Sequence, residues 1–192
     1  MYLASFVLPL AILAGLALPA AASQADAEAC DRLAASPYAT GGSATGVPFD
    51  ELDAPMAIRV CEAAVRAQPD DATLRYQLGR AYDAAGEIEN AIAAYTEAGT
   101  PLALYSLGVL HEGGYGVPVN PAKAFEYYQK AAEASLGIAR EALGRMYEKG
   151  LGTEVDHAMA ARLYREAADL GFAPANGSLG YLFENGWGVE KD

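Results

Sequence analysis

The sequence is poor in basic residues, and this shortage excludes one large class of function. Its 192 residues contain 13 Lys and Arg against 25 Asp and Glu, which gives a formal net charge of −12. Proteins that bind nucleic acids need clustered Lys and Arg to neutralise phosphates, and the sequence has no such cluster. We therefore expect no nucleic-acid partner. The excess negative charge favours solubility and partners that are neutral or basic.

The sequence also lacks the motifs of catalysis and metal binding. It has two histidines, and it contains no His-x-x-x-His, Cys-x-x-Cys, phosphate-binding loop or nucleophile elbow. The glycine-rich segment 113–116 follows a predicted helix instead of a strand, which argues against a nucleotide site. We expect no catalytic residue, no metal and no cofactor. His111 lies at a predicted packing position, and we expect His157 to be exposed to solvent.

Long apolar runs are missing except at the N-terminus. Residues 3–18 carry no charge, and the small residues Ala20, Ala21 and Ala22 follow them. This pattern is typical of a secretory signal peptide over residues 1–22, cleaved near Ala22 or Ser23. The basic residues that usually precede such a run are absent, so an uncleaved anchor and a misassigned start codon remain alternatives. Without a second run of about 20 apolar residues, the mature protein should be soluble and make no membrane contact.

Cysteine is scarce, and the two that occur form a plausible pair. Cys30 and Cys61 are 31 residues apart. An even number of cysteines in an exported chain predicts one disulfide, which would stabilise the fold by roughly 3–4 kcal/mol. A metal site is not expected, because no histidine lies nearby in the sequence.

The N-terminal region, residues 23–71, shows helical patterns without repetition. We expect a short helix over residues 24–35 and a Gly- and Pro-rich loop over residues 36–53. A second helix follows, capped by Asp53 and carrying one apolar face. The segment from Pro69 to Asp71 ends this helix and caps the next.

Beyond this region the sequence repeats. The Leu-Gly pair at Leu107-Gly108 recurs at intervals of 36 residues, as Leu143-Gly144 and Leu179-Gly180. Other residues recur in the same register: Gly114, Gly150 and Gly186; Gly116, Gly152 and Gly188; Asn120, Asp156 and Asp192; Ala124 and Ala160; Tyr128 and Tyr164; Ala131-Ala132 and Ala167-Ala168. A period of this length indicates stacked supersecondary units that bury their apolar faces against each other.

Each unit has the features of a helix hairpin. The glycine of the Leu-Gly pair lets the partner helix approach closely, at a cost of about 1 kcal/mol in helix propensity. The Gly-x-Gly loop ends the first helix with positive φ, and Asn120 or Asp156 caps the second. A shorter unit with Leu78-Gly79 precedes these, followed by Tyr82, Ala91, Tyr95 and Ala98, with its turn at Gly86-Glu87.

The pattern of Leu-Gly, Tyr, Gly-x-Gly, Asp-x-x-x-Ala, Tyr and Ala-Ala resembles the Sel-one-like repeat, a branch of the tetratricopeptide superfamily. The resemblance covers about residues 103–192. It implies an all-α fold, a right-handed solenoid of helix hairpins, with a tetratricopeptide-like unit at 72–99, Sel-one-like units at 100–135 and 136–171, and a truncated unit at 172–192. It also implies an adaptor or scaffold role, in bacteria often in the periplasm. Some exported members carry a Cys pair in every repeat and are linked to penicillin binding. The repeats here contain no Cys, and His111 replaces a family tyrosine.

The candidate binding surface follows from the stacking. First helices of stacked hairpins line the concave side, and the positions two residues before and after each Leu-Gly leucine should face it. These residues are Tyr76, Arg80, Tyr105, Val109, Glu141, Arg145 and Tyr181. Tyr and Arg are enriched at binding hot spots, and an extended peptide or a helix could lie along such a strip. Alternatively, these tyrosines pack between helices. A second candidate row consists of the loop residues Tyr115, Leu151 and Trp187, whose tips could instead fold back.

Taken together, the sequence predicts a non-catalytic scaffold that binds a protein or peptide partner. Two alternatives remain. The chain could be the recognition arm of a longer enzyme whose catalytic domain lies beyond Asp192, or a weak hydrolase or antibiotic binder that acts through its repeats. Because Asp192 occupies a helix-cap position, we expect either a fragment or a last unit in which Phe183 and Trp187 are less covered.

Overall fold

The computed structural model describes residues 18–39 and 46–188, and every regular element in this part of the chain is helical. The predicted signal peptide, residues 1–22, lies largely outside the described residues. The helices are α1 (Leu18–Ala34), η1 (Phe49–Glu51, a 3₁₀ turn), α2 (Ala54–Ala67), α3 (Ala72–Ala84), α4 (Ile88–Ala98), α5 (Pro101–Gly113), α6 (Pro121–Ala132), α7 (Gly137–Lys149), α8 (His157–Asp169) and α9 (Pro174–Asn185).

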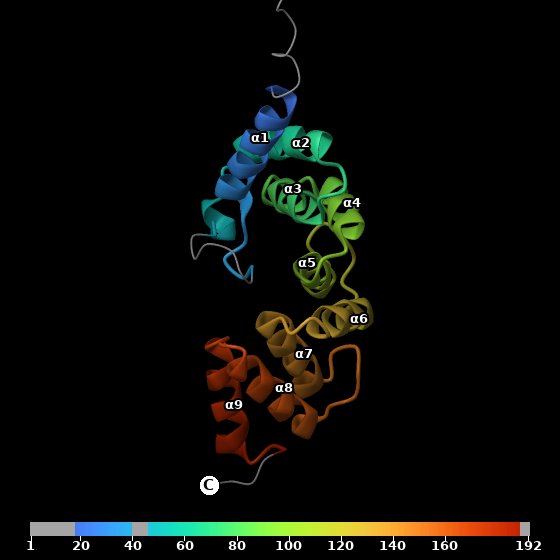
Figure 1. The fold of residues 1–192 in the computed structure, drawn as a ribbon. Helices are drawn as coiled ribbons and strands as arrows, with labels where there is room; N and C mark the ends of the chain where they lie inside the picture. The colour runs from blue at the N-terminus through green and yellow to red at the C-terminus, as the bar shows by residue number, and fades with distance from the viewer. Residues whose placement is uncertain (1–17, 40–45, 189–192) are drawn as a thin grey trace, which may run out of the picture.

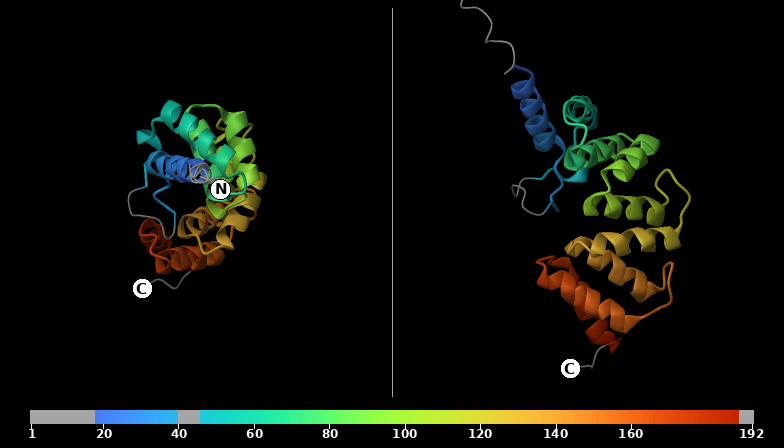
Figure 2. Two further views of the ribbon diagram at one scale, coloured as in Figure 1. Left: turned by 45° about the horizontal axis from the view of Figure 1, so that its top comes forward. Right: turned by 45° about the vertical axis from the view of Figure 1, so that its right-hand side comes forward.

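The helices form hairpins that stack in one direction. The pairs α3–α4, α5–α6 and α7–α8 follow each other down the molecule, and α9 lies at the far end (Figure 1). In the left view of Figure 2 the helices follow an arc, with α1 on its inner side. The predicted all-α solenoid of helix hairpins is therefore confirmed.

The predicted caps are present. The side chains of Asp53, Asp71, Asn120 and Asp156 each accept a hydrogen bond from the first turn of the following helix. Gly114 and Gly150 end α5 and α7 in the left-handed conformation, with φ of 71° and 66°. The first helix differs from the expectation, because it starts at Leu18 instead of residue 24. Alanine is the best helix former, and the Ala-rich stretch 20–22 extends the helix toward the N-terminus.

A glycine–tyrosine contact joins the two helices of each hairpin. The glycine of the Leu-Gly pair lies under a tyrosine ring of the second helix, so that an added Cβ would lie only 2.5–2.8 Å from the ring. The pairs are Gly79 with Tyr95, Gly108 with Tyr128, and Gly144 with Tyr164. All three rings are buried. Close approach of the helices thus depends on the missing side chain, as the repeat pattern predicts.

Each of these tyrosines also donates its hydroxyl to a carboxylate on the first helix of its hairpin. The acceptors are Asp83 at 3.2 Å from Tyr95, Glu112 at 2.7 Å from Tyr128, and Glu148 at 2.5 Å from Tyr164. This contact was not predicted from the sequence. The available signal was an acidic residue four positions after each glycine, which also occurs as Glu184 after Gly180.

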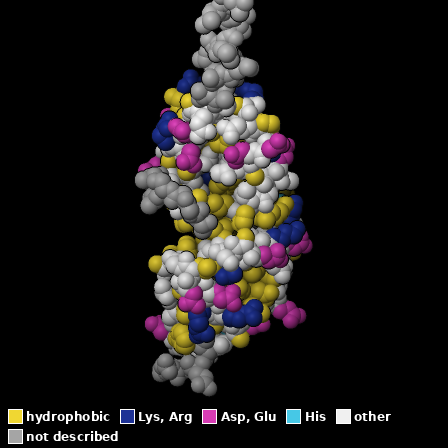
Figure 3. Space-filling view, in the orientation of Figure 1, with side chains coloured by type: hydrophobic (Ala, Val, Ile, Leu, Met, Phe, Trp, Pro, Cys, Tyr) yellow, Lys and Arg dark blue, Asp and Glu magenta, His cyan; other side chains and the backbone are white. Residues whose placement is uncertain are grey.

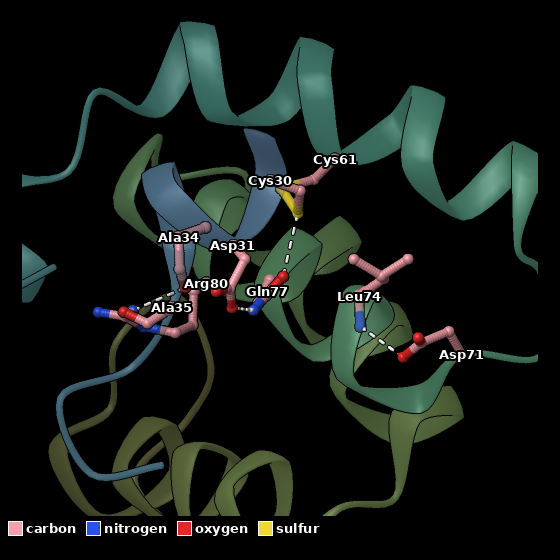
Figure 4. Close-up of a disulfide and its surroundings, with 9 residues drawn as sticks. All are labelled: Cys30, Asp31, Ala34, Ala35, Cys61, Asp71, Leu74, Gln77 and Arg80. Carbon is pink, nitrogen blue, oxygen red and sulfur yellow. Dashed lines mark hydrogen bonds between the residues drawn. A yellow bond between two sulfur atoms is a disulfide. The ribbon is translucent and has the colours of Figure 1, made fainter. Parts of the chain in front are cut away.

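The N-terminal region is held by a covalent bond. The predicted disulfide between Cys30 and Cys61 joins α1 to α2, with the two Cα atoms 4.8 Å apart and both sulfurs buried (Figure 4). Gln77 of α3 lies against it, with its side-chain oxygen 3.2 Å from the Cys30 sulfur. The amide of Gln77 donates to Asp31 at 2.8 Å. Helices α1, α2 and α3 are therefore connected at one point.

Candidate functional site: a groove on the inner side of the array

A groove of about 930 Å³ lies on the inner side of the arc. One wall is the N-terminal stem, defined as residues 35–39 and 46–50, and the other walls come from α3 and α5. Figure 3 shows hydrophobic side chains gathered in a hollow midway along this face. The lining residues include Ser36, Pro37, Tyr38, Pro48, Phe49, Asp50, Tyr76, Arg80, Asp83, Tyr105, Ser106 and Val109.

Arg80 holds the N-terminal stem in place. Its guanidinium donates to the carbonyls of Ala34 at 2.8 Å and Ala35 at 2.6 Å (Figure 4). It also donates to the carbonyl of Val47 at 2.8 Å. Ala34 ends α1, where the carbonyls carry the negative end of the helix dipole and favour a cation. The Arg80 residue is only 4% exposed, and these contacts compensate the cost of burying its charge. The structure therefore gives Arg80 a different role from the predicted partner contact.

Two tyrosines line the groove, Tyr76 from α3 and Tyr105 from α5. Tyr76 is buried and its ring centroid lies 5.8 Å from that of Tyr95. Tyr105 is half-buried, with its ring 5.6 Å from Tyr128. Burial raises the pKa of Tyr105 to about 12 and also raises the pKa of Tyr76. Both hydroxyls remain protonated at neutral pH. Val109 adds a half-buried aliphatic side chain to the same wall of the groove.

A carboxylate, that of Asp83, is among the groups that line the groove. It accepts the Tyr95 hydroxyl, and burial raises the pKa of this carboxyl group. A carboxylate in a poorly solvated position gains most from a donor or cation brought by a ligand. Asp83 was not among the predicted contact residues, although it lies one turn after Arg80 on the same helix.

The predicted residues of α7 lie beside the groove without lining it. Arg145 forms an ion pair with Glu112 of α5, and both are partly buried. Burial raises the pKa of Glu141, and the charge of Arg145 opposes this shift. Arg145 therefore connects two hairpins, while Glu141 extends the acidic character of the surface.

Tyr181 is separate from the other predicted contact residues. It lies on α9, it is 48% exposed, and its ring contacts Trp187 edge-on at 5.7 Å. At the groove itself, Tyr38 of the stem reaches across to Phe172, just before α9, with ring centroids 6.2 Å apart. The stem thus connects the first hairpins to the far end of the array.

The two histidines differ in how well the sequence predicted them. His111 is buried as expected and stacks on Tyr127 at 5.7 Å; burial and the nearby charge of Lys123 lower its pKa. His157 was expected to be exposed, and this was wrong. It is half-buried because the Trp187 ring stacks on it at 4.7 Å.

The Gly-x-Gly loops accordingly behave in two ways. Trp187 folds back on the preceding repeat, and Leu151 packs against the core of α6 and α7. Tyr115 remains 59% exposed at a loop tip.

In the described part of the chain, no helix is both long and apolar enough to cross a membrane. No cluster of three or more His, Cys, Asp or Glu side chains suited to a metal ion occurs among the described residues.

The stacked helix hairpins place the protein in the class of helical-repeat solenoids. The Sel1 repeat family model matches residues 101–136, 138–172 and 173–192, so this part of the chain consists of Sel1 repeats. Sel1 repeats are related to tetratricopeptide repeats, and Sel1 repeat proteins generally mediate protein–protein interactions.

Two solved structures are similar to the chain. A Sel1 repeat protein from Oxalobacter formigenes is 29% identical with a TM-score of 0.63, over 71% of this chain and 60% of that one. The protein c5321, a protective antigen of uropathogenic Escherichia coli with an SLR fold, is 27% identical with a TM-score of 0.66, over 89% of this chain and 37% of that one. The chain thus spans less than two thirds of either protein. No curated protein matches it.

Proposed function

We propose that this protein is an exported, non-catalytic adaptor that binds a segment of a partner protein on the inner side of its helical array. The observation that carries the proposal is the groove between the N-terminal stem and helices α3 and α5. Its size is within the range of sites that enclose a few side chains of a ligand. The presence of protein-binding repeats supports the same class of partner.

The chemistry of the groove favours an extended apolar segment that carries a basic residue. Tyr38 and Phe49 are each 49% exposed at the rim, and rigid aromatic side chains bind at low cost in conformational entropy. The more buried Tyr76 and Tyr105 rings line the same groove. Asp83 would accept a hydrogen bond or pair with a cation from the bound segment. Arg80 shapes the groove by fixing the stem. Val109 would contact the bound segment from the wall of the groove, and Glu141 and Arg145 would contact it from beside the groove. Only a longer partner segment would also reach Tyr181.

Export to the periplasm is the second part of the proposal. Disulfides such as Cys30–Cys61 persist in oxidising compartments, and the apolar, uncharged run near the N-terminus is typical of a secretion signal. Cell fractionation by osmotic shock followed by N-terminal sequencing tests this. We expect the periplasmic form to start near Ser23 and to contain no free thiol. Recovery only in the cytoplasm, with two free thiols, would contradict it.

Site-specific photo-cross-linking tests the groove. A photoreactive amino acid replaces Tyr38, which lines the groove, and in a matched protein it replaces Met56, an exposed apolar residue of α2 outside it. We expect a discrete adduct from position 38 and none of comparable yield from position 56. Mass spectrometry of the adduct identifies the partner segment. Combining the label with Tyr105→Ala should reduce the yield while circular dichroism remains unchanged. Equal labelling at both positions would exclude the groove as the binding site.

A further inference from the structure

The strongest unassigned feature is a carboxylate in the groove that lacks the arginine found at the same place in the next hairpin. Asp83 and Glu112 each lie four residues after the glycine of their Leu-Gly pair, and each accepts the tyrosine hydroxyl of its own hairpin. Glu112 is also bound by Arg145, which donates to both carboxylate oxygens through its two terminal nitrogens. Among the described residues, the Tyr95 hydroxyl is the one donor to the Asp83 carboxylate.

The difference arises at the position directly after each of these glycines. This position faces the preceding unit of the stack, because Arg80 donates to carbonyls of α1 and the stem, and Arg145 of α7 pairs with Glu112 of α5. In α5 the same position holds Val109, which has no side-chain donor. Asp83 of α3 therefore receives no arginine from the next hairpin, and both Asp83 and Val109 line the groove.

The surroundings of Asp83 match those of the occupied site. Arg145 lies near the tyrosine pair Tyr105 and Tyr128, whose ring centroids are 5.6 Å apart, and its positive charge opposes the rise in pKa of both hydroxyls. The corresponding pair beside Asp83 is Tyr76 and Tyr95, with ring centroids 5.8 Å apart. A planar guanidinium can stack on such rings and bind a carboxylate through two hydrogen bonds. The groove thus has the receptor for an arginine without the arginine.

We propose that the groove binds an arginine side chain of the partner segment, whose guanidinium pairs with Asp83 in the place left by Val109. This inference rests on the function proposed above, since it names the basic residue that the bound segment carries. Lysine suits the place less well, because its ammonium is strongly hydrated and lacks the planar fork of arginine. Arg80 does not fill the place, because its guanidinium donates to three backbone carbonyls.

The first experiment supplies the missing arginine within the chain and needs no partner. Val109→Arg should pair with Asp83 as Arg145 pairs with Glu112, whereas Val109→Met adds a side chain of similar length without charge. We expect Val109→Arg to melt about 2–4 °C above Val109→Met, and this difference to vanish when both carry Asp83→Asn. Equal melting temperatures of the two variants in the Asp83 background would overturn the inference.

The second experiment supplies the arginine from outside. Fluorescent peptides alanine–leucine–X–leucine–alanine carry arginine, lysine or the neutral isostere citrulline at X, and anisotropy follows their binding to the full chain. The salt concentration is about 0.15 M, so that general attraction to the acidic protein is screened. We expect saturable binding of the arginine peptide, weakened at least about tenfold by citrulline and about threefold to tenfold by lysine.

Variants of the protein locate that preference. Asp83→Asn should reduce the affinity for the arginine peptide to that for the citrulline peptide. Asp70→Asn makes the same change at an exposed position outside the groove and should leave the preference intact. Val109→Arg should weaken binding of the arginine peptide at least about tenfold more than Val109→Met does, because it fills the place with the chain's own guanidinium.

Several results would overturn the inference: no saturable binding of the arginine peptide, a preference for arginine that Asp83→Asn leaves unchanged, or loss of the preference in Asp70→Asn as well. Equal affinity for the three peptides, with all three weakened by Tyr105→Ala, would overturn it while the groove remains the binding site. Failure of the proposed function itself gives a different result, namely equal photo-labelling at Tyr38 and Met56.

Discussion

The N-terminal region, residues 18–71, and the repeat array that follows it both consist of paired helices, but they are held together in different ways. In the N-terminal region, α1 is attached by contacts that occur once: the Cys30–Cys61 disulfide and the bonds from Arg80 to three backbone carbonyls. In the array, one contact between a glycine, a tyrosine and a carboxylate is repeated in successive hairpins.

The difference shows where function can arise in a solenoid. A repeated contact fixes the stacking and produces a regular inner surface. The contacts that occur once place the N-terminal stem against α3 and α5, and this breaks the regularity to create a groove. The repeat alone therefore does not define the site; the N-terminal region supplies one wall. Separate changes in the two regions should have separable effects.

Removing the disulfide should have the largest effect. Cys30→Ala with Cys61→Ala should lower the free energy of unfolding by about 3 kcal/mol, because the bridge closes a loop of 31 residues in the unfolded chain. Urea unfolding followed by circular dichroism measures the total loss. Hydrogen exchange should show the change in α1 and α2, while α7 and α8 keep their protection. Equal loss of protection in both regions would show that the array depends on the N-terminal region.

Removing the stem's anchor should have the next largest effect. Arg80→Met keeps the aliphatic chain but leaves three carbonyls without their charged donor, at a cost of about 2–3 kcal/mol. Arg75→Met is the matched control on the same helix. Arg75 pairs with the exposed Glu97 at 3.2 Å and donates to the single carbonyl of Pro69, and we expect its loss to cost about 1 kcal/mol. Hydrogen exchange at Val47, whose amide donates to Ala35 at 2.9 Å, reports on the stem. Unchanged exchange in the Arg80→Met protein would refute the anchoring role.

The array can be tested through its glycines. Gly144→Ala would place a methyl group 2.8 Å from the Tyr164 ring, and overpacking of this kind costs about 1–3 kcal/mol. Gly180→Ala meets no described atom within 4 Å and should stabilise α9 by about 0.5–1 kcal/mol. Thermal unfolding of the two variants should therefore shift in opposite directions. A shift in the same direction would mean that the hollow at Gly144 can relax to accept the methyl group.

The sequence was sufficient to predict the fold because the same residues recur in register. The interval of 36 residues, the caps at Asn120 and Asp156, and the glycine hollows are local features that the sequence displays directly. The disulfide was also predictable, because the chain has only two cysteines. The start of α1 was placed six residues late, since the Ala-rich stretch was interpreted only as part of a signal peptide.

The site was less predictable, because it depends on contacts between segments far apart in the sequence. No residue close to Arg80 in the sequence indicates that its guanidinium donates to the carbonyls of Ala34, Ala35 and Val47. The burial of His157 depends on Trp187, one repeat later. The partner-binding residues themselves stay predictions: the structure brings Tyr76, Tyr105 and Val109 together in the groove, and it places Tyr181 elsewhere.

The smallest expected effect concerns the hydroxyl of the repeated contact, and it depends on pH. Burial, the hydrogen bond to Glu148 and the nearby carboxylate charges raise the pKa of Tyr164. A raised pKa means that the folded state holds the proton more tightly than the unfolded state, whose tyrosine pKa is about 10. The stabilisation that this pKa difference gives to the folded state is therefore complete below about pH 10 and is lost as the pH rises further.

Tyr164→Phe should cost about 1 kcal/mol of folding free energy at pH 7 and should reduce the loss of stability between neutral and alkaline pH. Tyr115→Phe removes a hydroxyl from an exposed ring and should change neither value. Melting temperatures of the three proteins across this pH range test the prediction, and an identical alkaline decline for wild type and Tyr164→Phe would contradict it.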